Sequence, residues 1–113
     1  MKPESIDGDP DHPILDAPYS WEVLEFVYRC APQSWRESHI DMTFERDGVV
    51  RRLRFYAPRG LEMRGPPTTS GMCILDVSGR GMEGLGVRVA NFEDGHGSPE
   101  FWAECVVDLD HLD

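Results

Sequence analysis

An arginine-rich run is the part of the sequence whose residue types best fit a binding surface. Arg52, Arg54 and Tyr56 recur at every second position, so in a β-strand their side chains share one face. Arginine and tyrosine are enriched at the energetic centres of protein interfaces, where they combine contact area with directed hydrogen bonds. The spacing therefore predicts a contact surface for another protein. The alternative is that Asp41 and Thr43, on the preceding predicted strand, absorb the two arginines.

A glycine-rich run, Gly79-Arg-Gly81-Met-Glu-Gly84, matches the G-x-G-x-x-G pattern of dinucleotide-binding loops. That chemistry needs a helix opening at the third glycine, because the helix N-terminus holds the pyrophosphate. Here Val87-Arg-Val89 follows, with the alternation of a strand. We therefore predict a strand connection that holds no nucleotide, with Arg80 at its tip facing an anion or a partner's carboxylate.

Residues able to act as nucleophiles or metal ligands are present but isolated. Ser78 lacks the Gly-x-Ser-x-Gly surroundings of a hydrolase nucleophile, and Cys73 and Cys105 occupy strand positions that suit small apolar side chains. No Cys-x-x-Cys pair is present to hold zinc. The histidines are scattered, at His12, His39, His96 and His111. We predict no catalytic residue, no metal and no cofactor, and a small hydrolase or metal-dependent enzyme ranks third among the functional hypotheses.

A second candidate surface lies near the C-terminus. Trp102 and Glu104 are predicted to point outward from a strand, and an exposed indole on a β-sandwich can stack on a sugar ring. A small-ligand or carbohydrate-binding module is therefore the second functional hypothesis. The alternative for Trp102 is that both faces of its sheet are packed.

The charge of the chain restricts its partners. The formal net charge of the 113 residues is −10, and such a field repels nucleic acids and anionic membrane surfaces, so we expect neither as a partner. A basic protein partner is favoured instead, as for an inhibitor or immunity-type protein of a bacterial kind. The acidic residues expected to make that contact are Glu93, Asp94, Glu100, Glu104 and Asp108.

The cysteine content indicates a cellular compartment. The chain has three cysteines at wide spacing, an odd number that argues against a disulfide framework and suits the reducing cytoplasm. No apolar run reaches the roughly 18 residues of a membrane span, and the acidic N-terminus has no secretion signal. We therefore expect a cytoplasmic protein.

The first part of the chain is predicted to hold an arm and then a strand. Residues 1–18 combine prolines with acidic residues and predict a mobile arm, anchored by Ile14-Leu15, before a single antiparallel β domain over 19–113. Alternation over 20–30 predicts a strand with Leu24, Phe26 and Tyr28 on one face. A helix over the same residues, paired internally by Glu25 and Arg29, would make the fold α+β.

The clearest local pattern is a hairpin over residues 39–57. Asp47-Gly48 between two alternating runs predicts a two-residue turn. With that turn, Ile40 faces Phe55 and Met42 faces Leu53 on a core side, while Asp41 faces Arg54 on the outer side. A shift of one residue would destroy both patterns, so the register is well specified.

The rest of the chain adds a loop and three strands. Residues 58–70 are rich in proline and glycine and predict a long surface loop. Residues 72–77 are apolar on both faces, which is typical of a strand buried on both sides, and 85–92 alternate. A single strand over 101–109 would point Phe101, Ala103, Cys105, Val107 and Leu109 inward and Trp102, Glu104, Val106 and Asp108 outward. Together these runs give about six strands and predict a mostly β protein, either an antiparallel sandwich or an open barrel. We expect this domain to bind another protein.

Overall fold

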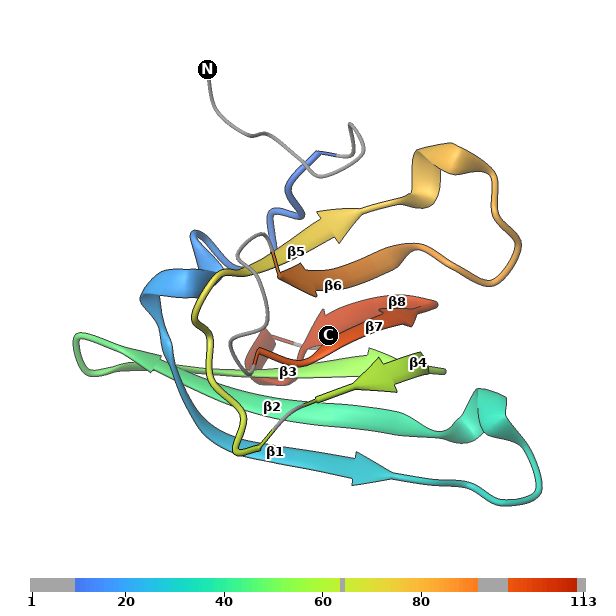
Figure 1. Cartoon of the computed structure of the whole chain (residues 1–113), viewed down its shortest axis with the longest axis horizontal. Helices are drawn as coiled ribbons and strands as arrows, with labels where there is room; N and C mark the ends of the chain where they lie inside the picture. The colour runs from blue at the N-terminus through green and yellow to red at the C-terminus, as the bar shows by residue number, and fades with distance from the viewer. Residues whose placement is uncertain (1–9, 64, 92–97, 112–113) are drawn as a thin grey trace.

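Two antiparallel sheets build the domain (Figure 1). The computed structural model describes residues 10–63, 65–91 and 98–111. The first sheet has the strand order β1-β2-β3-β8 and the second the order β4-β7-β6-β5, which confirms the predicted antiparallel sandwich with eight strands in place of about six. The strands are β1 (Glu22–Arg29), β2 (His39–Arg46), β3 (Val49–Tyr56), β4 (Arg59–Glu62), β5 (Met72–Asp76), β6 (Val87–Asn91), β7 (Glu100–Ala103) and β8 (Cys105–Asp108). Helical structure in the described ranges is confined to short 3₁₀ turns, among them η3 (Trp35–Glu37) and η4 (Ser78–Arg80).

The β2–β3 hairpin has the predicted register at every position. Ile40 pairs with Phe55, Met42 with Leu53, and Asp41 with Arg54. Asp47 and Gly48 both adopt positive φ, of 52° and 84°, which is the geometry that a two-residue turn between twisted strands requires. The core-side residues are fully buried.

Residues 22–29 form strand β1, so the alternative of a helix there is wrong. β1 pairs with β2 from Glu22↔Glu45 to Arg29↔His39, and its aromatic and β-branched residues suit this half-buried position. A bulge between Val23 and Glu25 makes Leu24 the extra residue.

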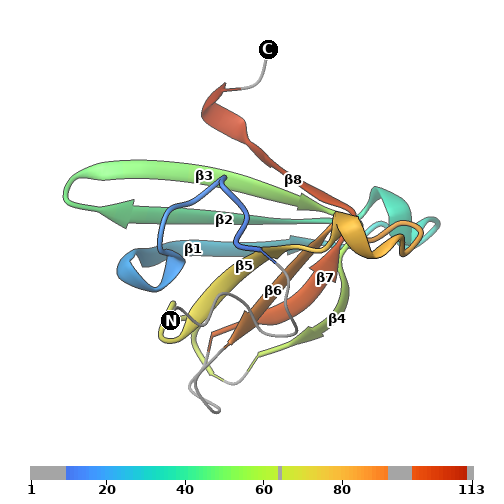
Figure 2. The same ribbon diagram turned by 90° about the horizontal axis from the view of Figure 1, so that it is seen from above.

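One continuous ribbon joins the two sheets. β3 runs on into β4, and β7 runs on into β8, so that Tyr56 pairs with Cys105 in the first sheet while Arg59 pairs with Trp102 in the second. Both segments of the ribbon bend between these pairs. Ala57 adopts a φ of 52° in the first segment, and Glu104 in the second donates its N–H to the Tyr56 carbonyl at 2.8 Å. Strands that switch sheets at a bend are the corner device of crossed β-sheet packing, and the two sheets cross obliquely in Figure 2.

The corner overturns two predictions. The run 101–109 is not a single strand, because the bend at Glu104 reverses the alternation: Phe101 and Ala103 are buried as predicted, but Cys105 is exposed and Val106 is buried. The predicted loop over 58–70 contains β4, which the ladder with β7 holds in an extended conformation. Alternation describes a straight strand, and one bend moves every later side chain to the other face.

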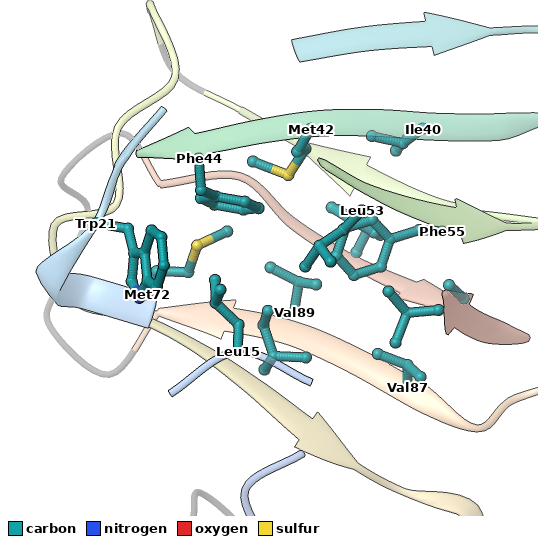
Figure 3. Close-up of a cluster of buried hydrophobic side chains, with 14 residues drawn as sticks. Leu15, Trp21, Ile40, Met42, Phe44, Leu53, Phe55, Met72, Val87 and Val89 are labelled. Carbon is teal, nitrogen blue, oxygen red and sulfur yellow. The ribbon is translucent and has the colours of Figure 1, made fainter. Parts of the chain in front are cut away.

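The core lies between the two sheets (Figure 3). The first sheet contributes Phe44, Leu53 and Phe55, and the second contributes Phe101 and Val89, all nearly or fully buried. Phe55 and Phe101 meet edge to face, with ring centroids 5.1 Å apart, across the space between the sheets.

β5 is buried on both faces, as predicted. Met72 and Ile74 belong to the main core, while Cys73 and Leu75 form a second apolar cluster on the outer face of the second sheet, with Val77, Ala90, Met82 and Trp102. The described part of the predicted arm lies against this strand: Asp11 forms a β-bridge with Leu75, and Leu15 is buried in the main core. Among the described residues, no helix is long and apolar enough to cross a membrane.

Candidate functional site

The predicted arginine surface lies on the outer face of the first sheet, and carboxylates engage its arginines. Arg54 Nε and Nη2 donate to the two oxygens of Asp41 at 2.7 and 2.9 Å, as the predicted register requires. These hydrogen bonds hold the pKa of the Asp41 carboxyl below its usual value. Arg52 does not turn to Thr43; it donates to Asp110 Oδ1 at 2.6 and 3.0 Å. The alternative, in which aspartate and threonine of the preceding strand pair with these arginines, is therefore correct for Arg54. Arg52 is also paired, but its acceptor is Asp110.

Tyr56 completes this face beside a histidine. It is half-buried, lies opposite His39 in the β2–β3 ladder, and their ring centroids are 6.5 Å apart. His39 Nε2 lies 3.7 Å from Asp41 Oδ2, and no described residue forms a hydrogen bond with this buried nitrogen. The row is polar but already paired through Asp41, which leaves little binding capacity for a partner.

Trp102 and Glu104 lie apart from the arginine face. Trp102 points to the outer face of the second sheet, on the other side of the core, where it is half-buried in the second apolar cluster. The guanidinium of Arg88 lies over its ring, 4.9 Å from the centroid. Glu104 is exposed at the corner between the sheets. The six predicted surface residues thus do not form one site; Arg80 lies in η4, with its side chain outside the described part of the structure.

A cluster of arginine and tryptophan side chains gathers beside Trp102 and was not predicted. Arg59, in β4, places its guanidinium 4.4 Å from the centroid of Trp35, which lies in the turn η3 between β1 and β2. Arg36 lies over the same ring at 5.2 Å. Arg59 also faces Trp102 across the β4–β7 ladder. We call Trp35, Arg36, Arg59, Arg88 and Trp102 the Trp–Arg patch.

The β5–β6 connection supports this patch from the second sheet. Arg59 Nη2 donates to the carbonyl oxygen of Gly84 at 3.5 Å, and Figure 2 shows η3 and this connection at the same end of the molecule. A Cβ on Gly84 would lie 2.9 Å from Arg59 Nη2, and Gly84 also has a φ of 75°. The glycine run is a strand connection, as predicted, because η4 and β6 stand where a nucleotide site would need a helix.

The arginines near the candidate surfaces differ in what they contact. One group pairs with aspartates: Arg46 with Asp16, Arg51 with Asp108, Arg52 with Asp110 and Arg54 with Asp41. Another group lies on tryptophan, and within the described ranges no carboxylate forms an ion pair with Arg36 or Arg59. Arg46 does both, since it also lies 4.4 Å from the centroid of the Trp21 ring. Arg59 also donates to the Gly84 carbonyl oxygen, and Trp35, under both guanidinium groups, keeps 43% of its surface exposed.

The geometry of the candidate nucleophiles fits structural roles. Ser78 Oγ donates to Asp76 Oδ1 at 2.5 Å within a turn. Burial raises the pKa of the Cys73 thiol to about 11 and also raises the pKa of Cys105, which opposes formation of the reactive thiolate. In the part of the chain that the structure describes, no three His, Cys, Asp or Glu side chains gather as a metal site would require.

Comparisons with family models, with curated proteins and with solved structures find no match for this chain.

Proposed function

We propose that this chain is a non-enzymatic protein-binding domain and that the Trp–Arg patch is its contact surface. The observation that carries the proposal is the position of Arg59, held 4.4 Å over Trp35 by residues from separate elements, with no ion-pair partner among the described residues. A guanidinium stacked on an indole is worth about 0.5–1 kcal/mol at an exposed site and stays free to donate in its own plane. Tryptophan and arginine are the residue types most enriched at interface hot spots.

The pairing of the other arginines supports this choice of surface. Arg52 and Arg54 already donate to aspartates, so a partner would have to break these contacts before it could use them. Arg36 and Arg59 form no ion pair with a described residue, so a carboxylate of the partner would displace no aspartate from them. A preordered side chain also loses less conformational entropy on binding than a free one.

The partner is a protein segment that gives oxygen acceptors to Arg36 and Arg59 and packs an apolar side chain beside the exposed part of Trp35. The net charge of −10 favours approach of a partner that is basic overall, which is the arrangement of an inhibitor or immunity-type protein. A cytoplasmic location belongs to the same proposal, because Cys30, Cys73 and Cys105 are all free thiols.

A sugar is a weaker candidate for this surface. Guanidinium groups lie over the ring of Trp35 at 4.4 and 5.2 Å and over the ring of Trp102 at 4.9 Å. A sugar that stacks on these rings would have to compete with the cations for the same π-faces.

Affinity capture with matched variants tests the proposal. Tagged wild-type protein is incubated with lysate of the source cells at about 0.15 M salt, and the captured protein is then purified and titrated. Arg59→Ala should weaken binding by about 30-fold, a hot-spot loss of about 2 kcal/mol, and Arg59→Lys should restore only part of it because a lysine does not stack as a plane.

Arg52→Ala is the control, since it removes an arginine from the other sheet. It should leave the affinity within about twofold of the wild type. A partner that binds Arg59→Ala as tightly as the wild type, or no captured protein at all, refutes the proposed surface.

A further inference from the structure

Strand β1 forms a long open edge of the first sheet. It contains eight residues, and among the described residues its only strand partner is β2. Leu24 and Tyr28 on this strand keep 55% and 45% of their surface exposed. Figure 1 shows β1 at the outer margin of its sheet. An edge of this length with exposed apolar side chains is a template for pairing with another strand.

The pairing of β1 with β2 determines which face each side chain occupies. Val23, Phe26 and Tyr28 lie opposite the buried Phe44, Met42 and Ile40, so they face the core side. The outward-facing residues of β1 lie opposite the polar residues of β2; they are Glu22, Glu25, Val27 and Arg29. Leu24 is the extra residue of the bulge and has no place in this alternation.

The charged residues at the two ends of β1, Glu22 and Arg29, have no ion-pair partner among the described residues of one molecule. Glu22 lies opposite Glu45, a like-charge pair that is unfavourable across neighbouring strands. An arginine placed beside Glu22 on the open side of the strand would compensate the two glutamates.

We propose that β1 pairs antiparallel with β1 of a second copy of this chain, which joins the two first sheets into one continuous sheet. In this register Glu22 lies opposite Arg29 of the second copy, Val23 opposite its Tyr28, and Glu25 opposite its Val27. Phe26 lies on the two-fold axis. A two-fold dimer repeats each contact, so the interface contains the Glu22–Arg29 pair twice.

The bulge makes this register self-consistent. Strand pairing requires that residues opposite each other occupy the same face. With Leu24 as the extra residue in each copy, every pair obeys this rule: Glu22 and Arg29 are both outward, and Val23 and Tyr28 are both on the core side. Without the bulge the same end-to-end pairing would place Glu25 opposite Phe26, which lies on the other face. The β1 edge can therefore pair with a second β1 edge so that opposite charges meet and paired side chains lie on the same face of the sheet.

This surface shares no residue with the Trp–Arg patch, so the dimer and the proposed function can each hold or fail alone. Charge reversal tests the dimer by sedimentation velocity, from about 1 μM to about 1 mM protein at about 0.15 M salt. Wild-type protein should shift from monomer to dimer in this range. Glu22→Arg and Arg29→Glu should each raise the dissociation constant at least about tenfold, because each puts two like-charged pairs in the interface.

Two rescues make the test specific. The double variant Glu22→Arg/Arg29→Glu restores both pairs with their order exchanged, and an equimolar mixture of the two single variants restores them in a heterodimer. Both should return to within about threefold of the wild-type dissociation constant. Amide exchange over residues 22–29 should slow as the protein concentration rises, which places the contact on β1.

Glu83→Arg is the control for net charge, because it makes the same charge change as Glu22→Arg on an exposed turn between β5 and β6. Glu22→Arg and Glu83→Arg both reduce the general repulsion between copies, so a nonspecific effect would strengthen the dimer in both. The proposal expects weakening in Glu22→Arg alone. A monomer at all concentrations, a dimer that the single variants leave unchanged, or single variants that the exchange does not rescue would each overturn it; melting curves of each variant verify folding.

Discussion

Replacing Gly86 with alanine should destabilise the domain at the point where the sheets join. An ideal Cβ at this position would lie 2.6 Å from the carbonyl oxygen of Glu104, and a backbone atom at the sheet corner has little freedom to move away. Gly86 also donates its N–H to the Ala103 carbonyl at 3.0 Å and accepts from Val77 at 2.9 Å. The added methyl group must therefore strain the chain or separate these contacts.

The magnitude follows from three contributions. Overpacking of this kind costs about 1–3 kcal/mol, and each weakened backbone hydrogen bond adds up to about 1 kcal/mol. Alanine also lowers the conformational entropy of the unfolded chain, which offsets about 0.4–1 kcal/mol of this loss in the free energy of unfolding. We expect Gly86→Ala to lower the free energy of unfolding by about 2 kcal/mol, which corresponds to a fall in Tm of about 8 °C for a domain of this size.

Urea unfolding and thermal melting of Gly86→Ala and Gly79→Ala measure this effect. Gly79 is the matched control, because among the described residues no heavy atom beyond its chain neighbours lies within 4 Å of its ideal Cβ, and its φ lies outside the left-handed region. Gly79→Ala should change the free energy of unfolding by less than about 0.5 kcal/mol. If both variants melt like the wild type, the close approach of residue 86 to the Glu104 backbone is refuted.

Two further predictions concern titratable groups. Because hydrogen bonds from Arg54 lower the folded-state pKa of Asp41 below its ordinary 3.8, this carboxylate stabilises the fold above that value, and the contribution is lost as the pH falls through the folded pKa. Asp41→Asn should therefore cost about 1 kcal/mol at neutral pH by urea unfolding, and this difference should shrink as the pH falls below 3.8 and disappear below the folded pKa; a difference that does not shrink contradicts the pairing. In thiol titration of the native protein with Ellman's reagent, Cys30 should react first; Cys105 is exposed too but should react more slowly, since partial desolvation raises its pKa. Cys73, with a pKa raised to about 11, should react only on unfolding, and rapid reaction of all the thiols would contradict its burial.

Local patterns in the sequence predict most of the first sheet. The Asp47-Gly48 turn and the alternation on either side are sufficient to give the β2–β3 register residue by residue, because a shift would expose Leu53 and bury Arg54. The same register predicts the Asp41–Arg54 pair. The acidic partner of Arg52 could not be predicted, because Asp110 comes beside it only when β8 joins the edge of β3.

The sequence by itself determined the fold class, the central hairpin and the core residues of that hairpin, because these depend on periodicity and on turns of a few residues. Only the tertiary structure decided the corner at Glu104, which divides one alternating run between two sheets. It also decided the Trp–Arg patch. Trp35 lies in the turn η3 and Arg59 begins strand β4, so no sequence pattern links them, and they meet only after the chain has bent at Ala57. Contacts that depend on where a sheet bends leave no periodic signal in the chain.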